Sequence, residues 1–154
     1  MVLSVNSPAP DFSLKDKDGK IHSLKKIKSP FIILYFYPKD DTPGCTIEAI
    51  SFTNHLDELK KLKAEVIGIS GGTEETKKKF CEKHNLKVRL LSDDTFNVCK
   101  AYGVYGEKSF LGKKFFGIKR TTFIIYGGEI IKVFENVSPK GHVEEVIEFL
   151  KNKK

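Results

Sequence analysis

Cysteine is scarce in this chain of 154 residues: only Cys45, Cys81 and Cys99 occur. They are odd in number and form no Cys-x-x-Cys pair, which argues against a secreted disulfide framework and leaves at least one thiol free. Long apolar runs are also missing. The longest, FIILYFY at 31–37, is too short to span a bilayer, and the N-terminus lacks a basic segment followed by an apolar one. We therefore expect a cytoplasmic protein with no membrane segment.

Arginine is nearly absent, since Arg89 and Arg120 are the only two, and the net charge of +7 comes from lysine. The excess forms no basic tail, so we expect general attraction to anions and no dedicated nucleic-acid binding. Hydrophobic residues make up 40% and charged residues 31%, the balance of an ordinary globular protein. The length suits one domain with a real core, so we expect a single domain over residues 1–154.

Metal and nucleotide motifs are weak. The four histidines are scattered, and Cys81-x-x-His84 is the only pair with metal-like spacing. The glycine pair at 71–72 lacks the Gly-Lys-Ser/Thr ending of a phosphate loop. We therefore expect neither a metal nor a cofactor, and we interpret the lysine run 77–79 as a solvated helix face.

The first half of the chain predicts alternating strands and helices. Two short alternating runs flank Asp18-Gly19, a strong hairpin signal. The runs 31–37 and 64–70 are continuously apolar, as in strands buried on both faces. An amphipathic helix is predicted after the 38–44 turn, reaching about Leu62, and a second from 74 to about 84, with Thr73 as its cap.

The second half predicts a short strand in 88–94, a short helix that ends at Gly103, a hairpin in 120–134 and a terminal amphipathic helix. Apolar residues follow neither helical nor strand periodicity from Gly103 to Lys119, which predicts a functional or covering loop. Its apolar side chains, Phe110, Leu111, Phe115 and Phe116, are candidates to shape a pocket for an organic hydroperoxide. The order of elements predicts an α/β, thioredoxin-like fold: a central mixed β-sheet flanked by helices, with an N-terminal β-hairpin extension.

Cys45 follows a predicted central strand at the point where a turn enters a helix. Sites in open sheets lie beyond the carboxyl ends of strands, and backbone N–H groups and the helix dipole favour a thiolate there. The competing interpretation is a small buried hydrophobe, which a lone cysteine near a helix start commonly is. Pro38 and Thr42, spaced before Cys45 between strand and helix, favour chemistry.

Ionisation alone does not make a fast nucleophile, because the nucleophilicity of a thiolate falls as its pKa falls. A fast reaction also needs hydrogen-bond donors that stabilise the negative charge developing on the leaving atom in the transition state. Thr42, one turn before Cys45, and Arg120, which begins a strand expected to pair near 31–37, are the candidates. Pro38 ends the strand, and Pro43 presets the approach to the helix.

The run YPKDDTPGCT contains Pro-x-x-x-Thr-x-x-Cys and resembles the active-site signature of the peroxiredoxins. The later run LLSDDTFNVCKAYGVYGEKSFLGKKFFGIKRTTFII is similar to the bacterioferritin-comigratory protein, or peroxiredoxin Q, subfamily, and the likeness covers nearly the whole chain. The resemblance implies a thiol peroxidase in which Cys45 attacks hydrogen peroxide or an organic hydroperoxide and becomes a sulfenic acid. It further implies that Pro38 shields Cys45, that Thr42 and Arg120 bind the peroxide, and that Glu48 orients the arginine.

Two positions depart from the subfamily pattern. Ile50 stands where many members carry a second cysteine, and Thr53 stands where relatives usually carry an arginine. Another group carries the second cysteine about one βαβ unit later, and Cys81 lies 36 residues after Cys45. The resemblance therefore favours an intramolecular Cys45–Cys81 disulfide, reduced by thioredoxin or a similar thiol reductant.

Alternatives to this cycle stay open: Cys81 without a partner, a one-cysteine peroxidase reduced by an external thiol, or a non-enzymatic redox-sensing binding module. Cys99 is expected to be structural. A disulfide needs Cα atoms within about 7 Å, so the first turn after Cys45 is expected to unwind before a bond to Cys81 forms. No cysteine near the C-terminus supports a bond between subunits, and we expect a monomer.

Overall fold

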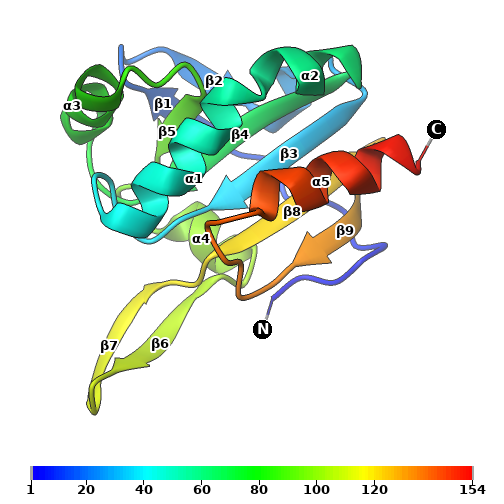
Figure 1. The fold of residues 1–154 in the computed structure, drawn as a ribbon. Helices are drawn as coiled ribbons and strands as arrows, with labels where there is room; N and C mark the ends of the chain where they lie inside the picture. Colours follow the sequence, from blue (N-terminus) through cyan, green and yellow to red (C-terminus); the bar gives the residue numbers. More distant parts are fainter. Residues whose placement is uncertain (1, 154) are drawn as a thin grey trace.

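The computed structural model describes residues 2–153 and arranges them around a seven-stranded mixed sheet (Figure 1). The strand order is β2-β1-β5-β4-β3-β8-β9. Strands β3, β4 and β5 are mutually parallel, and the other neighbours pair antiparallel. The strands are β1 (Ser13–Asp16), β2 (Ile21–Ser23), β3 (Phe31–Phe36), β4 (Ala64–Ser70), β5 (Arg89–Ser92), β8 (Thr121–Tyr126) and β9 (Glu129–Phe134).

Helices cover both faces of this sheet. They are α1 (Pro43–Asn54), α2 (Leu56–Lys61), α3 (Glu74–His84), α4 (Asn97–Ala101) and α5 (His142–Lys151), with a 3-10 turn η1 (Leu24–Lys26). Within residues 2–153 no helix is long and apolar enough to cross a membrane. The predicted thioredoxin-like plan is confirmed, including the N-terminal hairpin and the cap at Thr73, whose side chain accepts from the Thr76 N–H.

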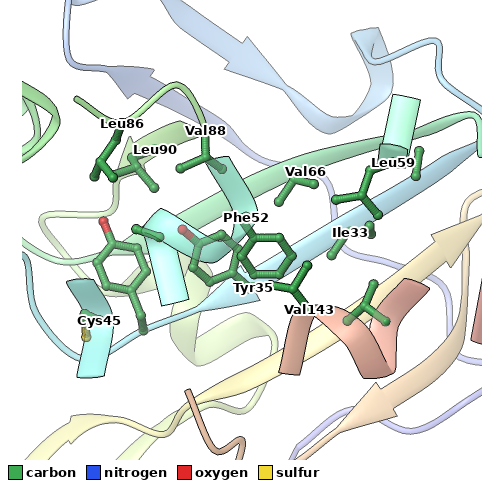
Figure 2. Close-up of a cluster of buried hydrophobic side chains, with 14 of the residues drawn as sticks. Ile33, Tyr35, Cys45, Phe52, Leu59, Val66, Leu86, Val88, Leu90 and Val143 are labelled. Atoms are coloured by element: carbon green, nitrogen blue, oxygen red, sulfur yellow. The ribbon is translucent and has the colours of Figure 1, made fainter. Parts of the chain in front are cut away.

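Alternation along β3 divides the core into two clusters, because successive side chains of a strand point to opposite faces. Ile33, Tyr35 and Tyr37 pack under α1, α2, α3 and α5. Figure 2 shows part of this first cluster, with Tyr35 stacked on Phe52 in its middle and Cys45 at its edge. The side chains at 32, 34 and 36 face the second cluster, which the N-terminal segment and α4 cover.

The helix predicted to reach about Leu62 is divided in two at His55. That residue leaves helical geometry, with ψ at 8°, and its Nδ1 lies 2.7 Å from the Ser51 carbonyl oxygen. The His55 backbone N–H also bonds the Ser51 carbonyl, at 3.2 Å, so the two helices meet at this residue without a gap in the hydrogen bonding. Leu59 still packs into the core from α2.

The segment 103–119, predicted to be a loop, is a two-stranded hairpin of β6 (Tyr105–Phe110) and β7 (Lys113–Ile118) that extends away from the sheet (Figure 1). Leu111 and Gly112 both have positive φ, the geometry of a tight two-residue hairpin turn. Neither face of the hairpin is fully buried, so no alternating pattern marks its strands. Phe110, Leu111 and Phe116 are largely exposed to solvent and do not line a closed pocket.

Candidate active site

Cys45 is the third residue of α1, directly beyond the carboxyl end of β3. Thr42 caps the helix in extended geometry and Pro43 is its first residue, where a missing N–H costs nothing. The Cys45 side chain is buried, with 1% of its surface exposed. The unpaired N–H groups of the first helical turn therefore lie beside a thiol that is shielded from bulk water.

Arg120 reaches Cys45 because of the strand register. Residue 121 of β8 pairs with Phe36, the last residue of β3, which brings Arg120 next to the start of α1. Its Nη2 donates to the Cys45 Sγ at 3.4 Å, and its Nη1 donates to Glu48 Oε1 at 2.8 Å. The Arg120 carbonyl accepts from the Val137 N–H, which fixes the backbone at this point. One guanidinium thus joins the thiol and the carboxylate.

Glu48 lies one turn after Cys45 on α1 and is fully buried. Burial raises the pKa of Glu48 to about 7, although the charge and hydrogen bond of Arg120 act in the opposite direction. Burial also acts to lower the pKa of Arg120, but Cys45 and Glu48 outweigh it and the pKa is raised. The second carboxylate oxygen of Glu48 and the Tyr35 hydroxyl are buried without a hydrogen-bond partner among the described residues.

Gly44 leaves the space that the guanidinium occupies. A Cβ at this position would lie 3.0 Å from Arg120 Nη2 and 3.2 Å from Pro139 Cγ. Both distances are shorter than ordinary van der Waals contact, so any side chain here would push Arg120 aside. Gly44 was not among the predicted site residues, and the only sequence signal is its position directly before Cys45.

Thr42 and Pro38 flank the same loop at its two ends. The Thr42 hydroxyl donates to the Lys39 carbonyl at 2.9 Å, so its oxygen lone pairs remain available as acceptors. Pro38 is half-buried where β3 gives way to the loop. The structure therefore joins Cys45, Arg120 and Glu48 by direct bonds and places Thr42 at the cap of the same helix.

Cys81 lies on α3, with 5% of its surface exposed, and belongs to the same cluster as Cys45. Burial raises the pKa of the Cys81 thiol, and Asp40 adds to the rise. All three cysteines fall within the described residues and all three are free thiols. Cys99 packs in the other cluster, across the sheet.

Comparisons with known proteins match this arrangement. The model of the AhpC/TSA family matches residues 5–134. The chain is 42% identical to "Peroxiredoxin Bcp" of Escherichia coli K12 over 150 residues, which is 97% of this chain and 96% of the relative. The chain belongs to the peroxiredoxins of the AhpC/TSA family. It is therefore a thiol peroxidase.

Solved structures of other peroxiredoxins share the fold throughout. The Xanthomonas campestris bacterioferritin comigratory protein is 31% identical, with a TM-score of 0.91 over 100% of this chain and 99% of that one. Two structures of Xanthomonas campestris peroxiredoxin Q, each with one cysteine replaced by serine, are both 32% identical. Their TM-scores are 0.88 and 0.89, and they cover 98% and 99% of this chain and 96% and 98% of their own.

The prediction that the lysine run 77–79 forms a solvated helix face is wrong for Lys77. Lys78 and Lys79 are exposed, but the Lys77 side chain of this peroxiredoxin is fully buried and pairs with Asp40 at 2.9 Å. A sequence signal did exist, because Lys77 lies three and four residues before Phe80 and Cys81, on the buried face of α3. Thr53, where the family resemblance implied an arginine, supplies a hydroxyl that accepts from the N–H groups of 87 and 88.

The described residues contain no cluster of side chains that could bind a metal ion. Across the described part of the peroxiredoxin, residues 2–153, no three side chains of His, Cys, Asp or Glu gather as a metal site. Cys81 and His84 instead face different partners: Cys81 packs in the core, and His84 Nε2 lies 2.9 Å from Asp41 Oδ1.

Proposed function

We propose that Cys45 is the peroxidatic cysteine and that Arg120, Thr42, Glu48 and Pro38 serve it. The observation that supports this most strongly is the pair of bonds from Arg120, one to the Cys45 sulfur and one to Glu48. Glu48 orients the guanidinium, because its buried Oε1 accepts from Nη1 while Nη2 bonds the Cys45 sulfur, and two bonds in different directions leave the group little freedom to turn. Pro38 shields the thiol from water.

In the first step the Cys45 thiolate attacks the terminal oxygen of the peroxide. The sulfur–oxygen bond forms as the oxygen–oxygen bond breaks, Cys45 is oxidised to a sulfenic acid, and the remaining oxygen leaves as water or an alcohol after it takes a proton. Arg120 donates to the oxygens as charge develops on the leaving atom. The Thr42 oxygen accepts the hydrogen of the hydroperoxide.

In the second step the Cys81 thiolate attacks the sulfur of the Cys45 sulfenic acid. A disulfide forms and the sulfenic oxygen leaves as water, which protects Cys45 from further oxidation. In the two Xanthomonas campestris variants the cysteines replaced by serine are 36 residues apart. Cys45 and Cys81 have the same separation, which supports their pairing. The first turn of α1 unwinds to bring the two sulfurs together.

A dithiol reductant such as thioredoxin then reduces the disulfide by thiol–disulfide exchange. We propose hydrogen peroxide and organic hydroperoxides as substrates. Support for the second class comes from the Xanthomonas campestris relative, whose structure is described in terms of alkyl peroxide reduction. We further propose that the single domain acts as a monomer in the cytoplasm, where free thiols stay reduced.

The test is steady-state peroxide consumption with thioredoxin, its reductase and NADPH. The wild-type chain is expected to turn over many times, Cys45→Ser to lose all activity, and Cys81→Ser to lose thioredoxin-driven turnover while still reacting once. A Cys81→Ser variant with full turnover would instead identify a one-cysteine peroxidase. Peroxide loss that stops at one equivalent in the wild type would identify a redox-sensing module.

A further inference from the structure

Lys77 is a cation without access to solvent. Its side chain has 0% exposed surface, and its Nζ donates to Asp40 Oδ2 at 2.9 Å and to Ser70 Oγ at 2.8 Å. A further hydrogen bond reaches the Gly71 carbonyl. All three donors of the ammonium are therefore used, and one of the three acceptors is a carboxylate in the loop between β3 and α1.

Asp40 is held on both of its oxygens. Oδ1 accepts from the Tyr37 hydroxyl at 2.7 Å, and Oδ2 accepts from Lys77 and from Thr76 Oγ1 at 2.9 Å. The Asp40 side chain is 8% exposed. Two of these donors, Thr76 and Lys77, belong to α3, the helix that carries Cys81. The loop is thus tied to α3 through the Asp40 carboxylate, and the more exposed Asp41 adds contacts to Lys83 and His84 of the same helix.

Asp40 lies inside the loop that forms the peroxide site. It stands two residues before Thr42, and the Thr42 hydroxyl closes a turn across it by bonding the Lys39 carbonyl. Whatever fixes Asp40 therefore fixes the turn that ends at the cap of α1. Cys45 follows within the first turn of that helix.

The buried Lys77–Asp40 ion pair is expected to add little to the stability of the fold. Burying two charges costs about as much as their attraction returns, and a buried pair replaced by apolar side chains is commonly neutral or more stable. Burial acts to lower the pKa of Lys77, which is the mark of that cost, while Asp40 acts to raise it. The neighbouring lysines 78 and 79 avoid the cost by facing solvent.

We propose that Lys77 is a positioning residue of the peroxidase: through Asp40 it sets the turn that presents Thr42 to the peroxide, so the oxidation of Cys45 requires α3 to be folded. One consequence depends on the Cys45–Cys81 disulfide proposed above. If α3 loosens as Cys81 moves toward Cys45, the ion pair opens and the peroxide site is dismantled until the disulfide is reduced and α3 refolds.

The test compares two reactions of Cys45 in a Cys81→Ser background, where the chemistry stops at the sulfenic acid. One is oxidation by hydrogen peroxide, which needs the donors of the loop. The other is alkylation by iodoacetamide, which needs only the thiolate and access to it. Both rates are followed by rapid quenching and peptide mass spectrometry, which distinguishes Cys45 from Cys99. Lys78→Met, on the exposed side of the same helix, is the matched control.

Lys77→Met is expected to slow oxidation by hydrogen peroxide about tenfold or more and to leave the alkylation rate within about twofold, because misplaced groups cost rate and the thiol itself is untouched. Lys78→Met is expected to change neither rate. If Lys77→Met does not fold, the double variant Asp40→Leu/Lys77→Met, which removes both charges, replaces it, and the same slowing is expected.

An unchanged oxidation rate in the folded variant would overturn the proposal. So would equal changes in both rates, because these would indicate general loosening or an altered thiol in place of a displaced turn. The outcome is separable from the proposed function itself. If Cys45 of the Cys81→Ser chain is not oxidised even with Lys77 intact, the assignment of Cys45 fails and Lys77 is not at issue.

Discussion

Arg120 donates from Nη1 to Oε1 of Glu48 at 2.8 Å, and Glu48 lies one helical turn after the buried thiol that the same guanidinium contacts. The arginine directly precedes β8 and the carboxylate lies on α1, so two segments far apart in the chain converge on Cys45. The relationship has direct consequences for activity and for stability.

Arg120→Lys is expected to lower the second-order rate of Cys45 oxidation by hydrogen peroxide about a hundredfold, the usual cost of removing one donor from developing negative charge. A single ammonium does not reproduce a fork that bonds sulfur and carboxylate together. Rapid-quench measurement of sulfenic acid formation checks the rate. Arg89→Lys, whose arginine pairs with Glu65 on the surface, is the control and should leave the rate unchanged.

Gly44→Ala is expected to slow the same step about tenfold, because the new Cβ meets the guanidinium and displaces it. Gly106→Ala is the matched control: a Cβ there would come no closer than 3.8 Å to its nearest neighbour, Cε of Lys119. Equal rates for Gly44→Ala and wild type would show that the arginine tolerates displacement.

Glu48 gives stability a pH dependence. Between pH 4.5, the ordinary pKa of the carboxyl, and about pH 7, its pKa in the folded chain, the folded chain keeps a proton that the unfolded chain has released. The contribution of Glu48 to the free energy of unfolding is therefore full below this window and falls as the pH rises through it. Urea unfolding at about pH 5 and about pH 7 is expected to show a larger loss for wild type than for Glu48→Gln. Parallel losses would contradict the raised pKa.

Cys99 is expected to take no part in the cycle. It is fully buried in the cluster on the other side of the sheet from Cys45 and Cys81, and its backbone N–H bonds Asp93 at 2.8 Å. Cys99→Ala should therefore keep thioredoxin-driven turnover at the wild-type rate, measured by NADPH consumption, with a small loss in the free energy of unfolding. Loss of turnover in a folded Cys99→Ala chain would assign Cys99 a role in resolution.

The sequence predicts those features that rest on strong local patterns. The apolar run at 31–37 predicts a central strand, and the strand that follows Arg120 was expected to pair near it; the register of β3 with β8 confirms that expectation. The position of Cys45 at a strand-to-helix turn is confirmed for the same reason. The link from Arg120 to Glu48 was implied by family resemblance and is present in the structure.

Other features lack a strong local pattern in the sequence. Lys77 is buried because Asp40, 37 positions earlier, supplies its counter-charge. The hairpin of β6 and β7 has no buried face, so only the Leu111-Gly112 turn marks it. At Lys77 a tertiary contact overrides the local preference of a lysine for solvent.

The central claim, that Cys45 is oxidised by peroxide and resolved by Cys81, is tested most directly by one experiment. The fully reduced chain is treated with one equivalent of hydrogen peroxide, alkylated, digested and mapped by mass spectrometry. The account predicts one disulfide, Cys45–Cys81, with Cys99 alkylated as a free thiol. A persistent Cys45 sulfenic acid beside an alkylated Cys81 would contradict it.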